Sequence, residues 1–190
     1  MGQGAHLGCI VASLVAWSLL EGILNTASSR EPAGQHEEAG QRLPAAVLWD
    51  MDGVLTIAGV RMPSADLVGA PPAQTVGNSC MIVVATDAPL DARQLGRVAR
   101  RAVFAMARVG ADYAQGSGDY ALAFSVGTGQ PPADEALDPI LGSTMDAVEE
   151  ALLNSVLAAT TTHGRHGRTV LGVPGGVVRE RLRRAGVVVA

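Results

Sequence analysis

The sequence predicts an α+β fold in which strands and helices form a layered sandwich, and three observations support this prediction. The chain has 190 residues of which 48% are hydrophobic, which is enough for one compact domain with a sizeable core. Short β-rich runs precede two longer segments of helical periodicity. The order is strands, helix, strand, helix with mixed connections, which favours a layered α+β sandwich over a doubly wound sheet.

The first 45 residues combine an apolar run with a polar stretch. The run 7–20 (LGCIVASLVAWSLL) is too short to span a bilayer comfortably, and no Arg precedes it. We therefore favour a buried helix or strand over a targeting segment and expect no membrane association. Residues 30–45 are polar, contain two Pro and two Gly, and are interpreted as a loop or linker.

Residues 46–86 contain three β-rich runs, AVLW, LTIAGV and CMIVVAT. Gly53, Pro63 and the pair Pro71–Pro72 separate them. Cys80 begins the third run and is predicted to be a small core residue rather than a nucleophile.

A helix is predicted to begin after Asp91, which can act as its N-cap, and to end at Gly110. Its apolar stripe is Leu95, Val98, Ala99, Ala102, Val103 and Met106. A Gly-rich turn, QGSGD, then leads into the strand YALAFSV, and a second helix is predicted from Ser143, whose spacing to Asp146 imitates a capping box. The segment THGRHGRTV, a Pro-Gly-Gly turn and a short basic helix, VVRERLRRA, follow.

Charge and cysteine content exclude several classes of protein. All fourteen basic residues are Arg, and eighteen acids leave a net charge of −4, which argues against a nucleic-acid binder. Residues 93–108 hold five Arg, whereas 134–150 hold six acids and no Arg; we interpret both as solvated helix faces rather than partner sites. Two cysteines, Cys9 and Cys80, do not make a disulfide framework, so a reducing compartment and a cytoplasmic location are expected.

Two motifs suggest metal chemistry, and for both we favour a structural interpretation. The run AVLWDMDGVLT resembles the first motif of the haloacid-dehalogenase phosphatases, in which Asp50 would be the nucleophile and Asp52 the acid/base with Mg²⁺. The chain has no Lys for the later motif of that family, so an acidic turn after a strand is favoured. His163 and His166 are three residues apart, but no Cys or carboxylate stands near them in the sequence, and a plain loop is favoured over a metal site.

The most informative segment runs from residue 75 to 125, TVGNSCMIVVATDAPLDARQLGRVARRAVFAMARVGADYAQGSGDYALAFS. It resembles the DmpA-type family of L-aminopeptidase/D-amidase/D-esterases and β-aminopeptidases, which are N-terminal-nucleophile hydrolases. The resemblance continues through MDAVEEALLNSVLAATTTHGRHGRTV and covers residues 55–190. It reaches back more faintly over EGILNTASSR.

This resemblance implies a partial α/β/β/α sandwich and a serine peptidase that cuts its own chain between Asn78 and Ser79. Residues 1–78 would then be a residual α-subunit part and 79–190 the β-subunit part of one composite domain. The freed Ser79 would supply a hydroxyl nucleophile and an α-amine of pKa about 8 that can act as its base. Ser117 and Asp119 match the Ser-Gly-acidic element of the family, and would bond and orient the nucleophile.

The resemblance further implies substrates that are small peptides, amides or esters, no metal or organic cofactor, and a homo-oligomer of αβ units. Two departures suggest an alternative. Family members are considerably longer before the cleavage point, so we expect a chain truncated at its N-terminus, and WDMDG stands where the family tends to carry an Asn that serves the oxyanion. Loss of one such donor costs about 10²–10³ in turnover, so a weak or inactive remnant that acts as an interaction domain is the second hypothesis.

Overall fold

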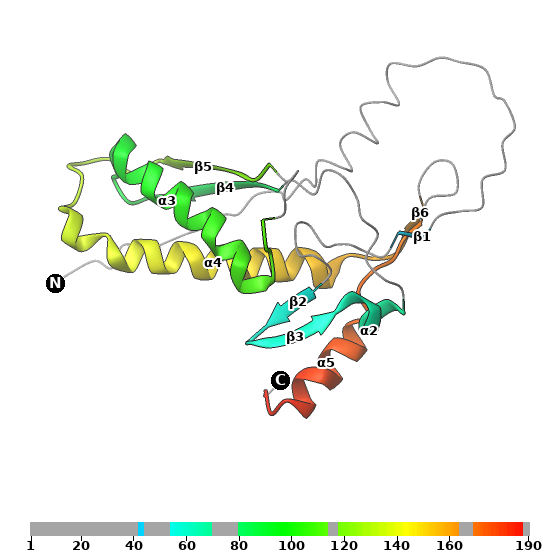
Figure 1. The fold of residues 1–190 in the computed structure, drawn as a ribbon. Coiled ribbons are helices and arrows are strands. Elements are labelled where there is room, and N and C mark those ends of the chain that lie inside the picture. Colours follow the sequence, from blue (N-terminus) through cyan, green and yellow to red (C-terminus); the bar gives the residue numbers. More distant parts are fainter. Residues whose placement is uncertain (1–41, 44–53, 70–79, 114–117, 164–168, 188–190) are drawn as a thin grey trace, which may run out of the picture.

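A computed structural model describes residues 42–43, 54–69, 80–113, 118–163 and 169–187 of the chain (Figure 1). Within these residues it has three small sheets and several helices, and one hydrophobic core joins the helices with the β2–β3 and β4–β5 sheets. The apolar run 7–20 and the predicted strand AVLW lie outside the described residues. The α+β fold class is as predicted.

The largest body of the fold is a βαβ unit with a second helix packed on it. Strands β4 (Met81–Thr86) and β5 (Tyr120–Ser125) pair in parallel. They are connected through α3 (Ala92–Ala105) and the 3₁₀ helix η1 (Met106–Val109). Helix α3 packs on the sheet, and α4 (Asp138–Ala158) packs against α3 and η1 (Figure 1). The runs CMIVVAT and YALAFSV therefore form the predicted strands.

The two faces of the β4–β5 sheet differ in burial. Ile82 and Val84 point to the helices and are 1% and 2% exposed. The opposite face carries large apolar side chains that the described residues leave 43–69% exposed: Met81, Tyr120, Leu122, Phe124 and Val126. We call this set the outer sheet face. Its alternation with the buried residues follows from the period of two in a strand.

A smaller body contains a hairpin and two helices. Strands β2 (Val54–Ile57) and β3 (Val60–Pro63) pair antiparallel. The β-rich run LTIAGV contributes to both strands and is divided by a turn. Ala58 and Gly59 have positive φ, 48° and 77°, as a tight hairpin turn of the mirror-image type requires. Helix α2 (Ser64–Val68) follows directly, and α5 (Gly175–Arg184) completes this body.

A third sheet joins distant parts of the chain. Strand β1 (Arg42–Leu43) pairs in parallel with β7 (Thr169–Val170), which pairs antiparallel with β6 (Thr162–His163). The prediction of a loop over residues 30–45 is therefore wrong for Arg42 and Leu43, while 30–41 and 44–45 lie outside the described residues. Backbone groups pair in a ladder whatever their side chains, so a polar composition does not exclude a short strand.

The start of α3 agrees with the sequence, whereas the starts of α4 and α5 differ. The helix predicted to run to Gly110 is α3 followed by η1, and Gly110 is the C-cap of η1. Asp91 is the N-cap of α3, as predicted, and it forms a capping box with Gln94. Helix α4 begins at Asp138 instead of Ser143, since Pro139 fits the first helical turn, where no N–H is needed. Helix α5 includes both glycines of the predicted Pro-Gly-Gly turn.

Pro174 is the N-cap of α5, and its carbonyl accepts hydrogen bonds from the backbone N–H groups of Val177 and Val178. These bonds close the first turn of α5, which contains Gly175 and Gly176. Glycine is a poor helix former in an interior but is tolerated next to a cap.

Candidate functional site

The amino-terminal ends of β4 and β5 lie side by side, because the two strands are parallel and Met81 is in register with Tyr120. Cys80 directly precedes β4 and Asp119 directly precedes β5. The backbone N–H of Tyr120 donates a hydrogen bond to the carbonyl of Cys80 at 2.9 Å. This pairing brings together two segments that are 39 residues apart in the sequence.

A carboxylate forms a second contact at this end of the sheet. The backbone N–H of Cys80 donates a hydrogen bond to Oδ1 of Asp119 at 2.8 Å. Cys80 is 2% exposed, and Asp119 is half-buried. A hydrogen bond to an ionised acceptor is shorter and stronger than a neutral one, so Asp119 fixes the first residue of the β4 segment.

The structure describes one of the predicted site residues. Asp119 is held against the residue that follows Ser79 in the sequence. Asn78, Ser79 and Ser117 lie outside the described residues, as do Asp50 and Asp52 of the phosphatase-like motif. Cys80 is a buried core residue, which confirms the prediction made for it.

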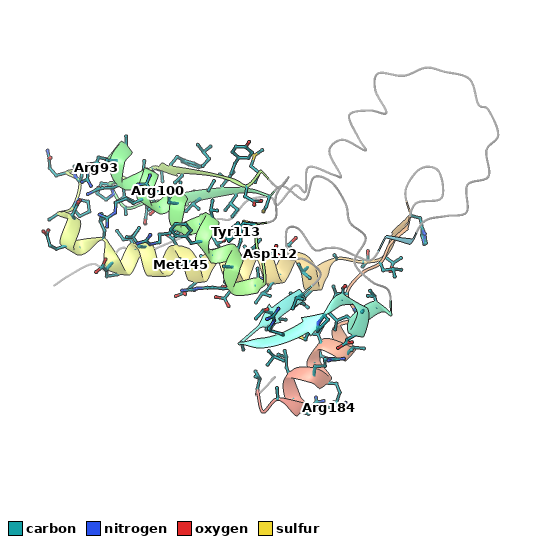
Figure 2. The ribbon with its side chains drawn as sticks, in the orientation of Figure 1. Arg93, Arg100, Asp112, Tyr113, Met145 and Arg184 are labelled. Atoms are coloured by element: carbon teal, nitrogen blue, oxygen red, sulfur yellow. The ribbon has the colours of Figure 1, made fainter. Side chains whose placement is uncertain are left out.

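Tyr113, near the start of the segment that leads to Asp119, was not singled out from the sequence. Its backbone has a φ of 57°, in the left-handed region. Its hydroxyl donates a hydrogen bond to the carbonyl of Val103 in α3 at 2.6 Å, and the side chain lies beside that helix (Figure 2). No sequence signal marks this conformation, because such φ values are typical of Gly, Asn and Asp rather than Tyr.

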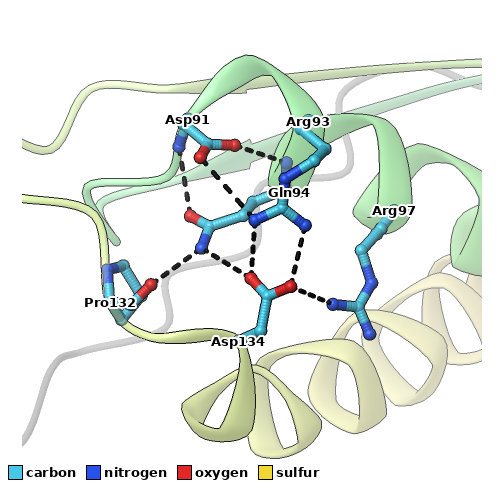
Figure 3. A network of polar contacts seen from close by, with 6 residues as sticks. All are labelled: Asp91, Arg93, Gln94, Arg97, Pro132 and Asp134. Atoms are coloured by element: carbon cyan, nitrogen blue, oxygen red, sulfur yellow. Dashed lines mark hydrogen bonds and ion pairs between the residues drawn. The ribbon is translucent and has the colours of Figure 1, made fainter.

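The carboxyl-terminal end of the same sheet carries a network of polar contacts (Figure 3). Arg93 donates two hydrogen bonds to the carboxylate of Asp134, at 2.6 and 2.8 Å. Gln94 donates to the carbonyl of Pro132 at 2.8 Å, and Arg97 lies 3.5 Å from Asp134. The hydrogen bond from Arg93 lowers the pKa of the Asp134 carboxyl to about 2.

A second ion-pair group joins α3 to α4. Arg108 lies 2.6 Å from Asp146 and 3.2 Å from Glu149, and its hydrogen bond to Asp146 raises the pKa of the guanidinium. The basic stretch 93–108 and the acidic stretch 134–150 thus face each other in part. The sequence interpretation as two solvated faces missed this pairing, because a period of 3.6 locates a face but not its neighbour.

Two negative findings apply to the described residues alone. Among them, no group of three His, Cys, Asp or Glu side chains is placed to hold a metal ion. His163 lies in β6, and His166 lies outside the described residues. None of the helices in the described ranges has the length and apolar character needed to cross a membrane.

Comparison with known families identifies the chain. Residues 18–170 match the model of Peptidase family S58. The chain belongs to Peptidase family S58. The match includes both strands of the candidate site and the two segments, 70–79 and 114–117, that precede them.

A curated relative and two solved structures are similar to this chain. Beta-peptidyl aminopeptidase BapA of Sphingosinicella xenopeptidilytica is 39% identical over 110 residues, which are 51% of this chain and 27% of the relative. The L-aminopeptidase D-Ala-esterase/amidase of Ochrobactrum anthropi, a prototype for the serine aminopeptidases, aligns with a TM-score of 0.63 at 31% identity over 73% of this chain and 41% of its own. The PH0078 protein of Pyrococcus horikoshii OT3 aligns with a TM-score of 0.63 at 36% identity, over 73% and 40%.

The O. anthropi structure is described as a variant of the Ntn hydrolase fold, so the S58 chain has part of that fold, as predicted. It spans 27% of the length of the BapA relative and 40–41% of these two solved chains.

Proposed function

We propose that this S58 chain is a serine aminopeptidase or amidase with Ser79 as its nucleophile, freed by cleavage between Asn78 and Ser79. The observation that carries the proposal is the hydrogen bond from the Cys80 N–H to Asp119. It joins the residue after the proposed nucleophile to the acidic residue of the Ser-Gly-Asp element, across 39 residues. A chance resemblance in two separate motifs gives no reason for such a contact.

Self-cleavage would begin with attack of the Ser79 hydroxyl on the carbonyl carbon of Asn78. The C–N bond between the two residues breaks, and the nitrogen takes up a proton and becomes the α-amine of Ser79. The ester that results is hydrolysed by water, which leaves a carboxylate on Asn78 and restores the Ser79 hydroxyl. The freed α-amine, with a pKa of about 8, then serves as a base at neutral pH.

Turnover of substrate would repeat this chemistry. The α-amine accepts the proton of the Ser79 hydroxyl as the oxygen attacks the substrate carbonyl, and it returns a proton to the leaving amine or alcohol. Water then hydrolyses the acyl-enzyme. In this scheme Asp119 holds the Cys80 backbone, so that the hydroxyl of the preceding residue is presented at the reactive angle, and Ser117 bonds the hydroxyl or the amine of the nucleophile.

The names of the relatives support a substrate class. BapA is a beta-peptidyl aminopeptidase and the O. anthropi enzyme is an aminopeptidase, esterase and amidase. We propose that the S58 chain releases N-terminal residues from small peptides, amides or esters. The family match extends across residues 50–52, so we do not propose the phosphatase alternative.

A second candidate function is an interaction domain of the same fold that does not turn over substrate. The observation that favours it is the outer sheet face, where Tyr120, Leu122 and Val126 are 61–69% exposed. Exposed apolar patches of this kind mark interaction surfaces. The two candidates differ in whether Ser79 reacts.

The test is intact-mass spectrometry of the wild-type chain and of Ser79→Ala after incubation at neutral pH, followed by hydrolysis of amino-acid amides. We expect fragments of 78 and 112 residues (190 − 78) in the wild type alone, together with turnover that the variant lacks. Ser143→Ala removes an exposed hydroxyl on α4 and should behave as the wild type. Turnover by Ser79→Ala would exclude Ser79 as nucleophile, and an inert wild type would favour the interaction domain.

A further inference from the structure

The smaller body of the fold contains a hollow between strand β3 and the last turn of α5. Its volume is about 400 Å³, which is large enough for a small ligand. Three of its five lining residues are Arg, and the set is Val60, Arg61, Arg181, Arg184 and Ala185. Arg184 lies near the end of α5 (Figure 2). The hollow shares no residue with the candidate site at β4 and β5.

This body carries an excess of positive charge, although the whole chain has a net charge of −4. Residues 54–69 and 175–184 contain five Arg and two acids, Asp66 and Glu180, so their formal charge is +3 (5 − 2). Basic residues in the last turn of a helix complement its dipole, which accounts for the Arg residues at the end of α5. The dipole gives no reason for Arg61, which adds a positive charge to the hollow from β3.

The two acids of this body each contact a guanidinium that lines the hollow. Nη2 of Arg181 lies 3.1 Å from Oδ2 of Asp66. Nε of Arg184 donates a hydrogen bond to Oε1 of Glu180 at 2.9 Å, and Glu180 also accepts from Arg183 at 2.7 Å. A guanidinium has five N–H donors, so one contact of this kind orients the group and leaves other donors for a ligand.

Arg61 differs from the other two Arg residues of the hollow. Within the described ranges its side chain forms no ion pair and no hydrogen bond, and it is exposed. Its backbone is fixed, because Arg61 is in register with Thr56 of β2. The hollow therefore combines one guanidinium that no carboxylate neutralises with two that carboxylates orient.

We propose that this hollow binds the phosphate group of a small phosphomonoester. The planar guanidinium donates parallel hydrogen bonds to phosphate or carboxylate oxygens. A phosphomonoester carries a charge of about −1.5 to −2 at neutral pH, so a formal charge of +3 attracts it more strongly than it attracts a carboxylate. Val60 and Ala185 offer apolar surface to the organic part of the ligand. This inference does not depend on the proposed function.

Isothermal titration calorimetry of the full chain at neutral pH tests the ligand class with three probes. We expect phenyl phosphate to bind about tenfold more tightly than benzoate, because its charge is larger. It should also bind about threefold more tightly than inorganic phosphate, because its ring contacts apolar surface. No binding of phenyl phosphate at millimolar concentration, or binding no tighter than that of either other probe, would overturn the proposal.

Amide chemical shifts measured by NMR locate the ligand. Phenyl phosphate should shift the amide signals of Val60, Arg61, Arg184 and Ala185, since these residues line the hollow. Shifts at Cys80 instead would place the ligand at the candidate site and overturn the proposal. Ser79→Ala should bind phenyl phosphate as the wild type does, so the outcome for this hollow is separate from the outcome for the proposed nucleophile.

Substitution of Arg61 tests its role, because its removal leaves no ion-paired carboxylate behind among the described residues. Arg61→Gln should weaken phenyl phosphate binding about tenfold, as expected for loss of one charge-assisted contact. Arg61→Lys keeps the charge without the planar fork and should lose only about threefold. Unchanged binding in Arg61→Gln, or equal losses in the two variants, would overturn the role given to Arg61.

Arg179→Gln is the matched control. It removes the same charge from an exposed position on α5 that does not line the hollow, so its affinity for phenyl phosphate should stay within about twofold of the wild type. A loss as large as that of Arg61→Gln would show that only the overall charge of this body attracts the anion, and the proposal would be wrong. Urea unfolding of each variant checks that the fold is retained.

Discussion

The two ends of the β4–β5 sheet are built differently. At the carboxyl-terminal end, Thr86 Oγ1 accepts a hydrogen bond from the Ala88 N–H. The Ser125 hydroxyl donates to the Ala88 carbonyl and accepts from the Gly127 N–H. The Arg93–Asp134 network lies beyond them (Figure 3). At the amino-terminal end, within the described ranges, the Asp119 carboxylate accepts from the Cys80 N–H, and the Cys80 carbonyl accepts from the Tyr120 N–H.

This difference matters because open parallel sheets usually bind ligands outside the carboxyl ends of their strands. In this S58 chain local hydrogen bonds and ion pairs occupy that end, and the proposed nucleophile, Ser79, precedes β4 in the sequence. If Ser79 is the nucleophile as proposed, the site lies at the amino-terminal end of β4, opposite to the usual location.

The largest effect is expected from Asp119→Asn, which removes the charge at the amino-terminal end. The Cys80 N–H would lose its ionised acceptor, and we expect self-cleavage and amide hydrolysis to slow about 10²-fold, a size typical of misplaced reacting groups. Single-turnover and steady-state rates measure this. Glu150→Gln, an exposed neutralisation on α4, should leave both rates unchanged, and equal losses in the two variants would contradict a special role for Asp119.

At the carboxyl-terminal end, Gly127→Ala should affect stability. A Cβ at this position would lie 2.0 Å from the Asp87 carbonyl oxygen, so backbone must move. We expect the free energy of unfolding in urea to fall by about 1–3 kcal/mol. Gly142→Ala, in α4 with nothing within 4 Å of its added Cβ, should instead raise it by about 0.5–1 kcal/mol, and a loss of stability in both would show that crowding at Asp87 is not the cause.

The smallest effect is expected from the exposed ion pair at the same end. The lowered pKa of Asp134, about 2 against an ordinary 3.8, means that its stabilising contribution is present above pH 4 and is lost as the pH falls toward 2. Asp134→Asn should therefore be less stable than the wild type at pH 6, and the difference should be clearly smaller at pH 2. The difference should also shrink in high salt.

Glu135→Gln is the control for this measurement, because it neutralises the adjacent exposed acid. Chemical denaturation at the two pH values should show no pH-dependent difference from the wild type for Glu135→Gln. A difference between Asp134→Asn and the wild type that is as large at pH 2 as at pH 6 would show that the carboxylate charge is not what stabilises this end.

Local features were predicted well from the sequence. Asp91 caps α3, the apolar runs form β4 and β5, and Cys80 is buried. Capping and strand periodicity are decided within a few residues, so the sequence carries them directly. The family resemblance rests on the same kind of information, namely short motifs at a fixed spacing.

Two element boundaries and one contact between distant segments were not predicted. The start of α4 at Asp138, the hairpin turn at Ala58, and the ion pair between Arg93 and Asp134 all differ from the sequence interpretation or were absent from it. A charge stretch does not identify its partner, and a turn inside an apolar run is chosen by the pairing of both strands.

The sequence by itself determined the family, the order of the main elements and the candidate residues Ser79, Ser117 and Asp119, because each follows from residue types and their spacing along the chain. The tertiary structure decided which atom Asp119 contacts and that Tyr113 adopts a left-handed backbone held by α3. The Asp119 contact depends on the parallel pairing of strands whose registered residues, Met81 and Tyr120, are far apart in the sequence. Only the packed core brings such residues together, since no local preference encodes a contact at that separation.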